Sequence, residues 1–174
     1  LEEAYGCDLL DENEYLYLLA CLLQAVQKVA NTSGTYQAFF KFLEPRALKE
    51  LVLTPLEMEQ LPVKSPENRV MNIGANKLAR NLSADIAYID PPYTTTQYAN
   101  SYHLLETIAR YDSPEIFGKT GRRKNRILSE YSNRSRAAIE FEDLLRQLQC
   151  RHVLISYSNQ SIIPLEELIE RSEE

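Results

Sequence analysis

The sequence has few cysteines and no apolar run long enough to cross a membrane. Its three cysteines, Cys7, Cys21 and Cys150, are odd in number and far apart, which excludes a disulfide framework and the paired spacing of a zinc site. The apolar runs fall far short of the about 20 residues that a transmembrane helix needs, and residues 1–3 do not open a signal peptide. We therefore expect a cytoplasmic protein without a metal site.

Basic residues are scarce over most of the chain and concentrated in one segment. The net charge of −6 argues against binding of nucleic acid by the whole surface. Residues 119–136, however, carry seven cationic side chains against a single carboxylate, Glu130, and Gly118 and Gly121 give the segment mobility. The clustering predicts phosphate contacts, with a solvated loop as the alternative. The predicted contact residues are Lys119, Arg122, Arg123, Lys124 and Arg126.

The first part of the chain has the periodicity of helices. Asp11 and Glu14 have the spacing of a capping box and predict a helix over residues 11–30. This helix is apolar over a wide arc, which predicts that most of it is buried. Shorter helices are predicted over 36–43 and 46–53. Three prolines within 55–66 then predict a boundary between subdomains.

From residue 69 the pattern alternates between short strands and helices. Strands are predicted at 69–72, 86–89 and 152–157, and helices at 75–82, 102–111, 135–148 and from 164 onward, with a long loop at 115–134. Alternation of this kind is typical of an α/β protein with parallel strands. The two later strands are apolar without alternation, which predicts that both are buried.

The strand at 86–89 leads into a rigid corner. Asp90 follows the strand, and Pro91 and Pro92 must end it because they lack backbone donors and have a fixed φ. Tyr93 closes the corner with an aromatic ring. In α/β sheets, ligands bind just beyond the carboxyl ends of the strands. The corner is therefore the predicted site of chemistry.

The tetrapeptide Asp90–Tyr93 after an apolar strand resembles motif IV of S-adenosylmethionine-dependent amino-methyltransferases. Alone it could be an ordinary strand-ending turn, but three further blocks in the right order resemble the D12 class of adenine-specific DNA methyltransferases. These blocks are Gln97-Tyr98 with Tyr102 to Thr107, Asn31-Thr32 with Gly34 and Tyr36, and Leu154 to Ser158. The resemblance implies the C-terminal part of a Rossmann-like sheet with a helical insertion. Residues 1–62 would be the insertion, resembling a target-recognition region, and residues 63–174 the core segment.

The resemblance also implies roles for the corner. The Asp90 carboxylate and the Pro91 carbonyl would accept both N–H bonds of an adenine amine taken out of double-stranded DNA. Pro92 would stiffen the corner, and Tyr93 would stack on the base. Tyr98 is a further predicted DNA contact, and S-adenosylmethionine is the implied methyl donor. His103, by contrast, is expected to satisfy a hydrogen bond rather than to act in catalysis.

The glycine-rich cofactor turn of this class is absent from the sequence. The five glycines are scattered, and no two of them follow a predicted strand in the required arrangement. Gly74 also stands where the family has an acidic residue. The chain could be a fragment of an active enzyme, a degenerate remnant, or a subunit completed by another chain. Because a fragment would leave a sheet edge exposed, we expect a homodimer or another cover at that edge.

Two other functions are compatible with the sequence. One is methylation of a different amine, such as adenine in RNA or cytosine N4. The other is a catalytically silent DNA-binding or assembly module that uses the basic segment. The sequence specifies neither the recognition sequence nor a paired restriction endonuclease.

Overall fold

The computed structural model describes residues 1–57 and 68–173, which fall into two compact units. The first unit comprises Leu1–Val63 and Tyr98–Ile127, and the second comprises Lys64–Gln97 and Leu128–Glu174. The predicted boundary between residues 62 and 63 lies outside the described residues, as do Pro62 and Pro66. The predicted division into an insertion and a core segment stays a prediction.

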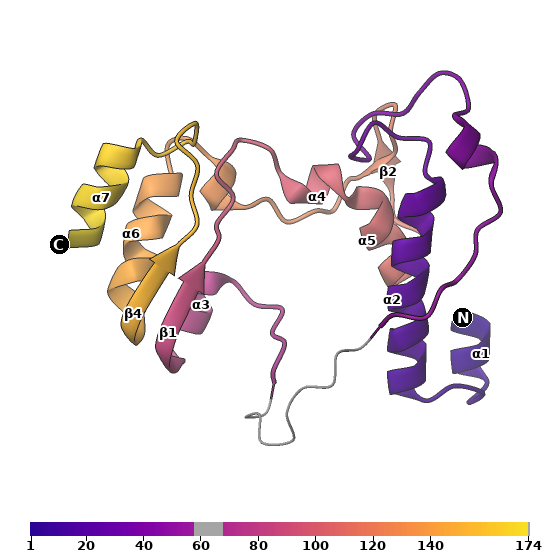
Figure 1. The fold of residues 1–174 in the computed structure, drawn as a ribbon, viewed down its shortest axis with the longest axis horizontal. Helices are drawn as coiled ribbons and strands as arrows, with labels where there is room; N and C mark the ends of the chain where they lie inside the picture. Colours follow the sequence, from indigo (N-terminus) through magenta and orange to yellow (C-terminus); the bar gives the residue numbers. More distant parts are fainter. Residues whose placement is uncertain (58–67, 174) are drawn as a thin grey trace. The chain divides into compact units, whose positions relative to one another are not determined.

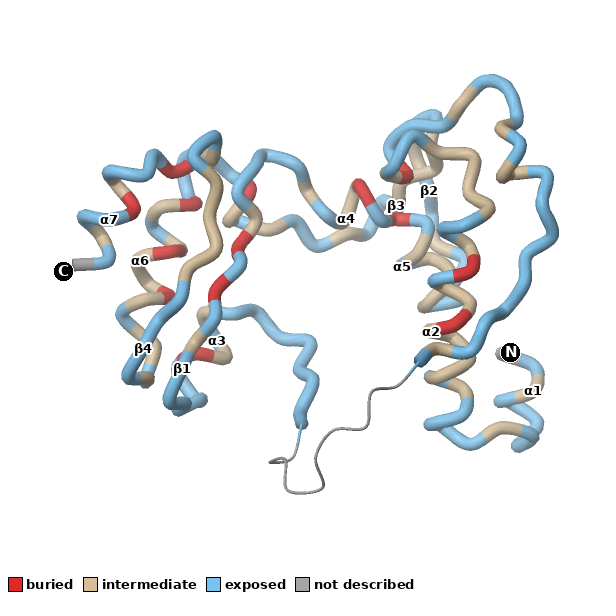
Figure 2. The backbone as a smooth tube through the Cα atoms, viewed as in Figure 1, coloured by how far each residue is buried: buried red, intermediate tan, exposed pale blue. Residues whose placement is uncertain are grey.

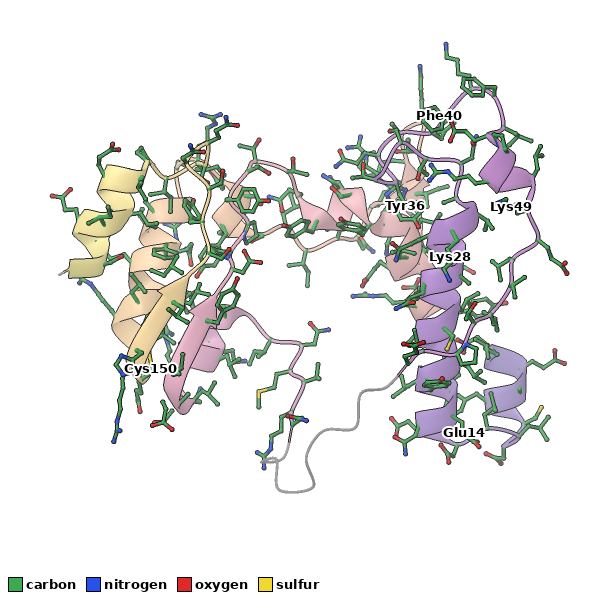
Figure 3. The ribbon with its side chains drawn as sticks, viewed as in Figure 1. Glu14, Lys28, Tyr36, Phe40, Lys49 and Cys150 are labelled. Atoms are coloured by element: carbon green, nitrogen blue, oxygen red, sulfur yellow. The ribbon has the colours of Figure 1, made fainter. Side chains whose placement is uncertain are left out.

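The longest helix of the first unit is α2 (Glu12–Val29), which begins with the predicted capping box. The Asp11 carboxylate accepts from the Glu14 backbone N–H at 2.9 Å, and the Glu14 carboxylate accepts in return from Asp11. Glu14 is labelled on the first turn in Figure 3. The predicted burial of α2 is wrong: only Cys21 and Ala25 are buried, and Leu16 is 52% exposed. A short helix, α1 (Glu2–Gly6), precedes it.

The segment after α2 is a loop, and the helices predicted at 36–43 and 46–53 are wrong. Only a 3₁₀-helix, η1 (Pro45–Leu48), forms there. The Asn31 side-chain amide donates to the carbonyl oxygens of Phe40 and Phe42, both at 3.1 Å, and its oxygen accepts from the Glu44 N–H at 3.1 Å. An asparagine that bonds backbone groups in this way competes with helical hydrogen bonding. The loop is therefore folded around Asn31.

The remainder of the first unit is two short helices and a hairpin. Helices α4 (Tyr98–Ser101) and α5 (His103–Arg110) confirm the predicted helix after the tetrapeptide loop and extend it by one N-terminal turn. Strands β2 (Ile116–Phe117) and β3 (Arg122–Arg123) pair in antiparallel fashion within the predicted loop 115–134. Their connection contains Gly118 and Gly121, which take positive φ values of 73° and 68°. Glycine adopts this conformation without strain.

The second unit contains a two-stranded parallel sheet. Strand β1 (Ser83–Ile89) pairs with β4 (Gln149–Ile155) in a register that aligns Ile89 with Ile155. The helices are α3 (Ala75–Ala79), α6 (Ala137–Gln147) and α7 (Leu165–Glu173), with a 3₁₀-helix, η2 (Glu130–Ser132). This arrangement confirms a mixed α/β unit with parallel strands. The strand predicted at 69–72 does not form.

Only one face of the sheet is covered by described residues. Helices α3, α6 and α7 lie on the same side of the strand pair (Figure 1), around a core of Ala79, Ile89, Ala137, Phe141, Leu144, Ile163 and Leu168. On the opposite face Ile86, Tyr88 and Leu154 are 58%, 69% and 57% exposed. Most of β1 and β4 has the colour of exposed residues in Figure 2. The predicted burial of both strands is therefore wrong for this face. Parallel strands that are apolar on both sides are normally covered on both sides.

The described residues contain neither a helix that could span a membrane nor a cluster that could bind a metal ion. None of the helices among residues 1–57 and 68–173 has the length and apolar character to span a membrane. Over the same residues, no group of three or more histidine, cysteine, aspartate or glutamate side chains could hold a metal ion.

Candidate base-binding corner and basic hairpin

The tetrapeptide begins where β1 ends and is bonded to the chain after β4. The Ile89 carbonyl accepts from the Ser156 N–H at 2.8 Å, which continues the parallel ladder by one residue. The Tyr93 carbonyl accepts from the Ile162 N–H at 3.0 Å. Both ends of the corner are therefore fixed to the same neighbouring segment, and two proline rings fix φ between them. Pro91 is buried within this corner.

The segment that holds the corner is itself ordered by short-range bonds. The Ser161 hydroxyl accepts from the Ser158 N–H at 3.2 Å and donates to the Ser158 carbonyl. The Tyr157 hydroxyl accepts from the Ile163 N–H at 3.3 Å, and its ring lies 6.3 Å from that of Phe141 in the core. Burial raises the pKa of Tyr157 above its ordinary value. The support of the corner thus reaches into the core of the second unit.

Two side chains of the corner are accessible. Asp90 and Tyr93 are exposed at the carboxyl end of β1, as the sequence predicts for a ligand site. Within the part of the chain that the structure describes, no hydrogen bond engages the Asp90 carboxylate or the Pro91 carbonyl oxygen. An acceptor pair with free lone pairs, placed on a rigid turn, suits the binding of an amine that has two N–H bonds.

Gln97 anchors the loop after the tetrapeptide. In the sequence it stood out only as part of a block that resembles the family. The Gln97 side-chain amide donates to the Ser129 carbonyl at 3.0 Å and its oxygen accepts from the Ser129 N–H at 2.7 Å. The Ser132 hydroxyl donates to the Thr96 carbonyl at 3.2 Å. The Gln97 amide makes the two hydrogen bonds to Ser129 that a paired backbone group would make, although the two residues are more than 30 positions apart. Such a contact leaves no periodic pattern in the sequence, which therefore did not predict it.

In the first unit, the hairpin of β2 and β3 carries most of the predicted phosphate contacts. The guanidinium groups of Arg122 and Arg126 lie over the Phe117 ring, 4.8 and 4.7 Å from its centroid. Such cation–π contacts hold the cationic groups in place. The Arg126 guanidinium also donates to the carbonyl oxygens of Arg123 and Lys124, at 3.3 and 3.4 Å. Lys119 is exposed in the turn, and Lys124 pairs with Glu115 at 2.8 Å on the surface.

Arg123 is placed differently from its neighbours. It is 4% exposed, and its guanidinium donates to both carboxylate oxygens of Asp112 and, at 3.2 Å, to the Thr107 hydroxyl. The hydrogen bond between the two charged groups lowers the pKa of the Asp112 carboxyl and raises that of Arg123. The donors of Arg123 are thus engaged inside the protein, which does not favour the predicted phosphate contact.

Tyr98, the remaining predicted DNA contact, is exposed on α4. Its ring lies 6.0 Å from that of Tyr102 in a tilted arrangement. Tyr98 and the hairpin belong to the first unit, whereas the tetrapeptide belongs to the second. The structure describes each of these groups within its own unit.

The described residues do not fit the methionine end of S-adenosylmethionine. The loops after β1 and β4 are a proline corner and a serine-containing turn, neither with a glycine. The glycines with positive φ, Gly34, Gly118 and Gly121, all belong to the first unit, whereas the parallel strands belong to the second. A backbone approach to the cofactor of the kind that a glycine-rich turn permits is therefore absent from the described residues.

Comparison with known proteins identifies the family of the chain. The model of the D12 class N6 adenine-specific DNA methyltransferases matches residues 2–170, and the chain belongs to this family. The chain is 61% identical over 170 residues to Modification methylase LlaI of Lactococcus lactis subsp. lactis. It is 44% identical over 163 residues to Type II methyltransferase M.FokI of Planomicrobium okeanokoites and 40% identical over 163 residues to M.NlaIII of Neisseria lactamica.

The chain spans only part of these relatives. The three alignments cover 98%, 93% and 94% of this chain but 27%, 25% and 48% of the relatives. No solved structure matches the chain.

Proposed function

We propose that the polypeptide to which this chain belongs transfers a methyl group from S-adenosylmethionine to the N6 amine of adenine in double-stranded DNA. Family membership and the names of its relatives support the reaction class. The observation that carries the proposal is the rigid corner at the end of β1, where the exposed Asp90 carboxylate precedes Pro91. We further propose that it acts in the cytoplasm as the modification enzyme of a restriction–modification system.

The corner would act on the acceptor amine. The lone pair of an exocyclic amine is delocalised into the base, so the nitrogen is a weak nucleophile. Acceptance of its two N–H bonds by the Asp90 carboxylate and the Pro91 carbonyl would orient it and favour the positive charge that develops during transfer. Tyr93 would stack on the extruded base. S-adenosylmethionine would supply the methyl group, from a site that the described residues of this chain do not form.

The hairpin would hold the DNA backbone. Lys119 and Arg122 present cationic groups on a structured hairpin, and Lys124, Arg126 and Tyr98 lie on the same unit as further contacts. Neutralisation of phosphates by such groups supplies affinity that does not depend on sequence. We leave Arg123 out of this set, because its guanidinium is bonded to Asp112.

We propose that the second unit is part of a Rossmann-like sheet and that its uncovered face and strand edges are covered in the active protein. The exposure of Ile86, Tyr88 and Leu154 supports a cover. A second copy of the chain is one candidate, and we retain the proposed homodimer on that ground. Light scattering of the 174-residue chain tests it, because a monomer over the micromolar range would reject the homodimer.

The reaction itself can be tested in a chimera. Residues 1–170 would replace the matching segment of Modification methylase LlaI, which is 61% identical to this chain. We expect incubation with S-adenosylmethionine and duplex DNA to yield N6-methyladenine, identified by mass spectrometry of the nucleosides. Methylcytosine as the product, or methylation of RNA in preference to DNA, would contradict the proposed substrate. A chimera that binds DNA without any methylation would favour a silent module.

A further inference from the structure

The imidazole of His103 is enclosed between two backbone carbonyl groups. His103 is 3% exposed at the start of α5, and it satisfies hydrogen bonds as the sequence predicts. Its Nδ1 lies 2.8 Å from the Asn100 carbonyl oxygen, and its Nε2 lies 2.6 Å from the Thr120 carbonyl oxygen. Thr120 is in the turn of the hairpin, between β2 and β3, so the ring connects the hairpin turn to α4.

Two carbonyl acceptors require two donors. A neutral imidazole has one N–H and one lone pair, so one nitrogen would face a carbonyl oxygen with its lone pair, which is repulsive. The imidazolium ion donates from both nitrogens, and such charge-assisted bonds are short and strong. We infer that His103 is an imidazolium clamp, a charged ring bonded to both carbonyl groups, that positions the hairpin turn for contact with DNA. The contact with DNA rests on the proposed function.

The charged groups around the ring are already engaged with one another. On β3, Arg123 pairs with Asp112, which follows α5, and on α5, Glu106 pairs with Arg110. Lys119 is exposed in the hairpin turn, and α4 contributes only the phenol of Tyr98. Among the described residues, no carboxylate is hydrogen-bonded to the imidazole. The positive end of α5 and the cation of Arg123 both oppose a charge on the ring. The two carbonyl groups are therefore what holds the proton.

The clamp fixes the turn that precedes β3. Its two bonds hold the turn that carries Lys119 and leads into Arg122. Loss of either bond would release one side of this turn. Affinity of the hairpin for DNA should then fall.

The protonation of His103 can be observed without DNA. The chain has two histidines, and His152 is exposed, so ¹⁵N-histidine labelling gives two ring spin systems that the His152→Gln variant assigns. We expect both ring nitrogens of His103 in the folded chain to carry protons under the conditions of the DNA-binding measurement. A single protonated ring nitrogen in His103 under these conditions would overturn the clamp. Because this readout needs no methyl transfer, it is independent of the proposed function.

Binding of a short DNA duplex tests the positioning role. We expect His103→Gln to bind the duplex about tenfold more weakly than the unaltered chain, the equivalent of one charge-assisted hydrogen bond. His152→Gln should retain the affinity of the unaltered chain. Equal affinities for the unaltered chain and His103→Gln would overturn the role. If His103→Gln fails to fold, the resonance measurement still decides the protonation state.

Discussion

The corner at residues 90–93 and the hairpin of β2 and β3 reach rigidity by different means. The corner is fixed by two proline rings and two backbone hydrogen bonds, so the Asp90 side chain takes no part in holding it. The hairpin is fixed by ionisable side chains, through the pair of Arg123 with Asp112 and the bonds of His103. A functional side chain can therefore be removed from the corner without a loss of folding. Removal of an anchor from the hairpin should affect both folding and binding.

The largest effect is expected at the corner. Asp90→Ala in the chimera should reduce the rate of methyl transfer by about 10²–10³-fold, as removal of one preorganised polar contact to a reacting group does. Its thermal unfolding should match that of the unaltered chimera, because the Asp90 side chain is exposed. Single-turnover kinetics with labelled S-adenosylmethionine measure the rate. Equal loss of activity and of thermal stability would contradict a purely chemical role.

Within the hairpin, two adjacent arginines should behave differently. Arg123→Ala should destabilise the chain by roughly 2–3 kcal/mol, because it removes a buried group and leaves its partners unsatisfied. Arg122→Ala, the matched control, should lower stability by less than about 1 kcal/mol, since its cation–π contact lies near the surface. Urea unfolding followed by circular dichroism compares them. Similar stability losses would show that burial of Arg123 does not anchor the hairpin.

The ion pair of the hairpin should also depend on acid. Because the pKa of Asp112 is lowered in the folded chain, its contribution is present above the pKa of the unfolded carboxyl. It is lost as pH falls through the lower pKa of the folded state. Asp112→Asn should therefore be less stable than the unaltered chain at neutral pH, with a difference that shrinks in acid. A difference that does not change between neutral pH and acid would contradict the pairing.

The smallest effects should come from two cations in or just after the hairpin. Lys119→Ala and Arg126→Ala should each weaken DNA binding without sequence preference and reduce the slope of log K against log salt by about one. Lys28→Ala on α2, labelled in Figure 3, is the matched control and should leave the slope unchanged. Fluorescence anisotropy over a series of salt concentrations measures the slopes. An unchanged slope in Lys119→Ala would remove it from the proposed interface.

The sequence predicted the parts of the molecule that depend on local chemistry. The capping box of Asp11 and Glu14, the strand before Asp90 and the stop at Pro91 were all readable because each follows from neighbouring residues. The loop around Asn31 was not readable, since the apolar residues of 36–43 predicted a helix and concealed the side chain that organises the loop.

Long-range partners set the other limit on prediction. A cationic cluster shows where basic side chains lie in sequence but not which of them turn inward. Arg123 and Arg122 are adjacent and alike, yet one binds Asp112 and the other lies over Phe117, because successive residues of a strand point to opposite faces. In the same way, the sequence indicated that β1 is apolar. It could not indicate that one face of this strand has no cover among the described residues.

The most direct test of the account is a crystal structure of the chimera bound to its DNA duplex. The proposed function predicts an adenine extruded from the stack, with its N6 at about 2.6–3.2 Å from an Asp90 carboxylate oxygen and from the Pro91 carbonyl. The Tyr93 ring should lie against the face of that base. An adenine that stays stacked in the duplex, or an extruded base whose N6 is held by other groups while Asp90 faces solvent, would contradict it.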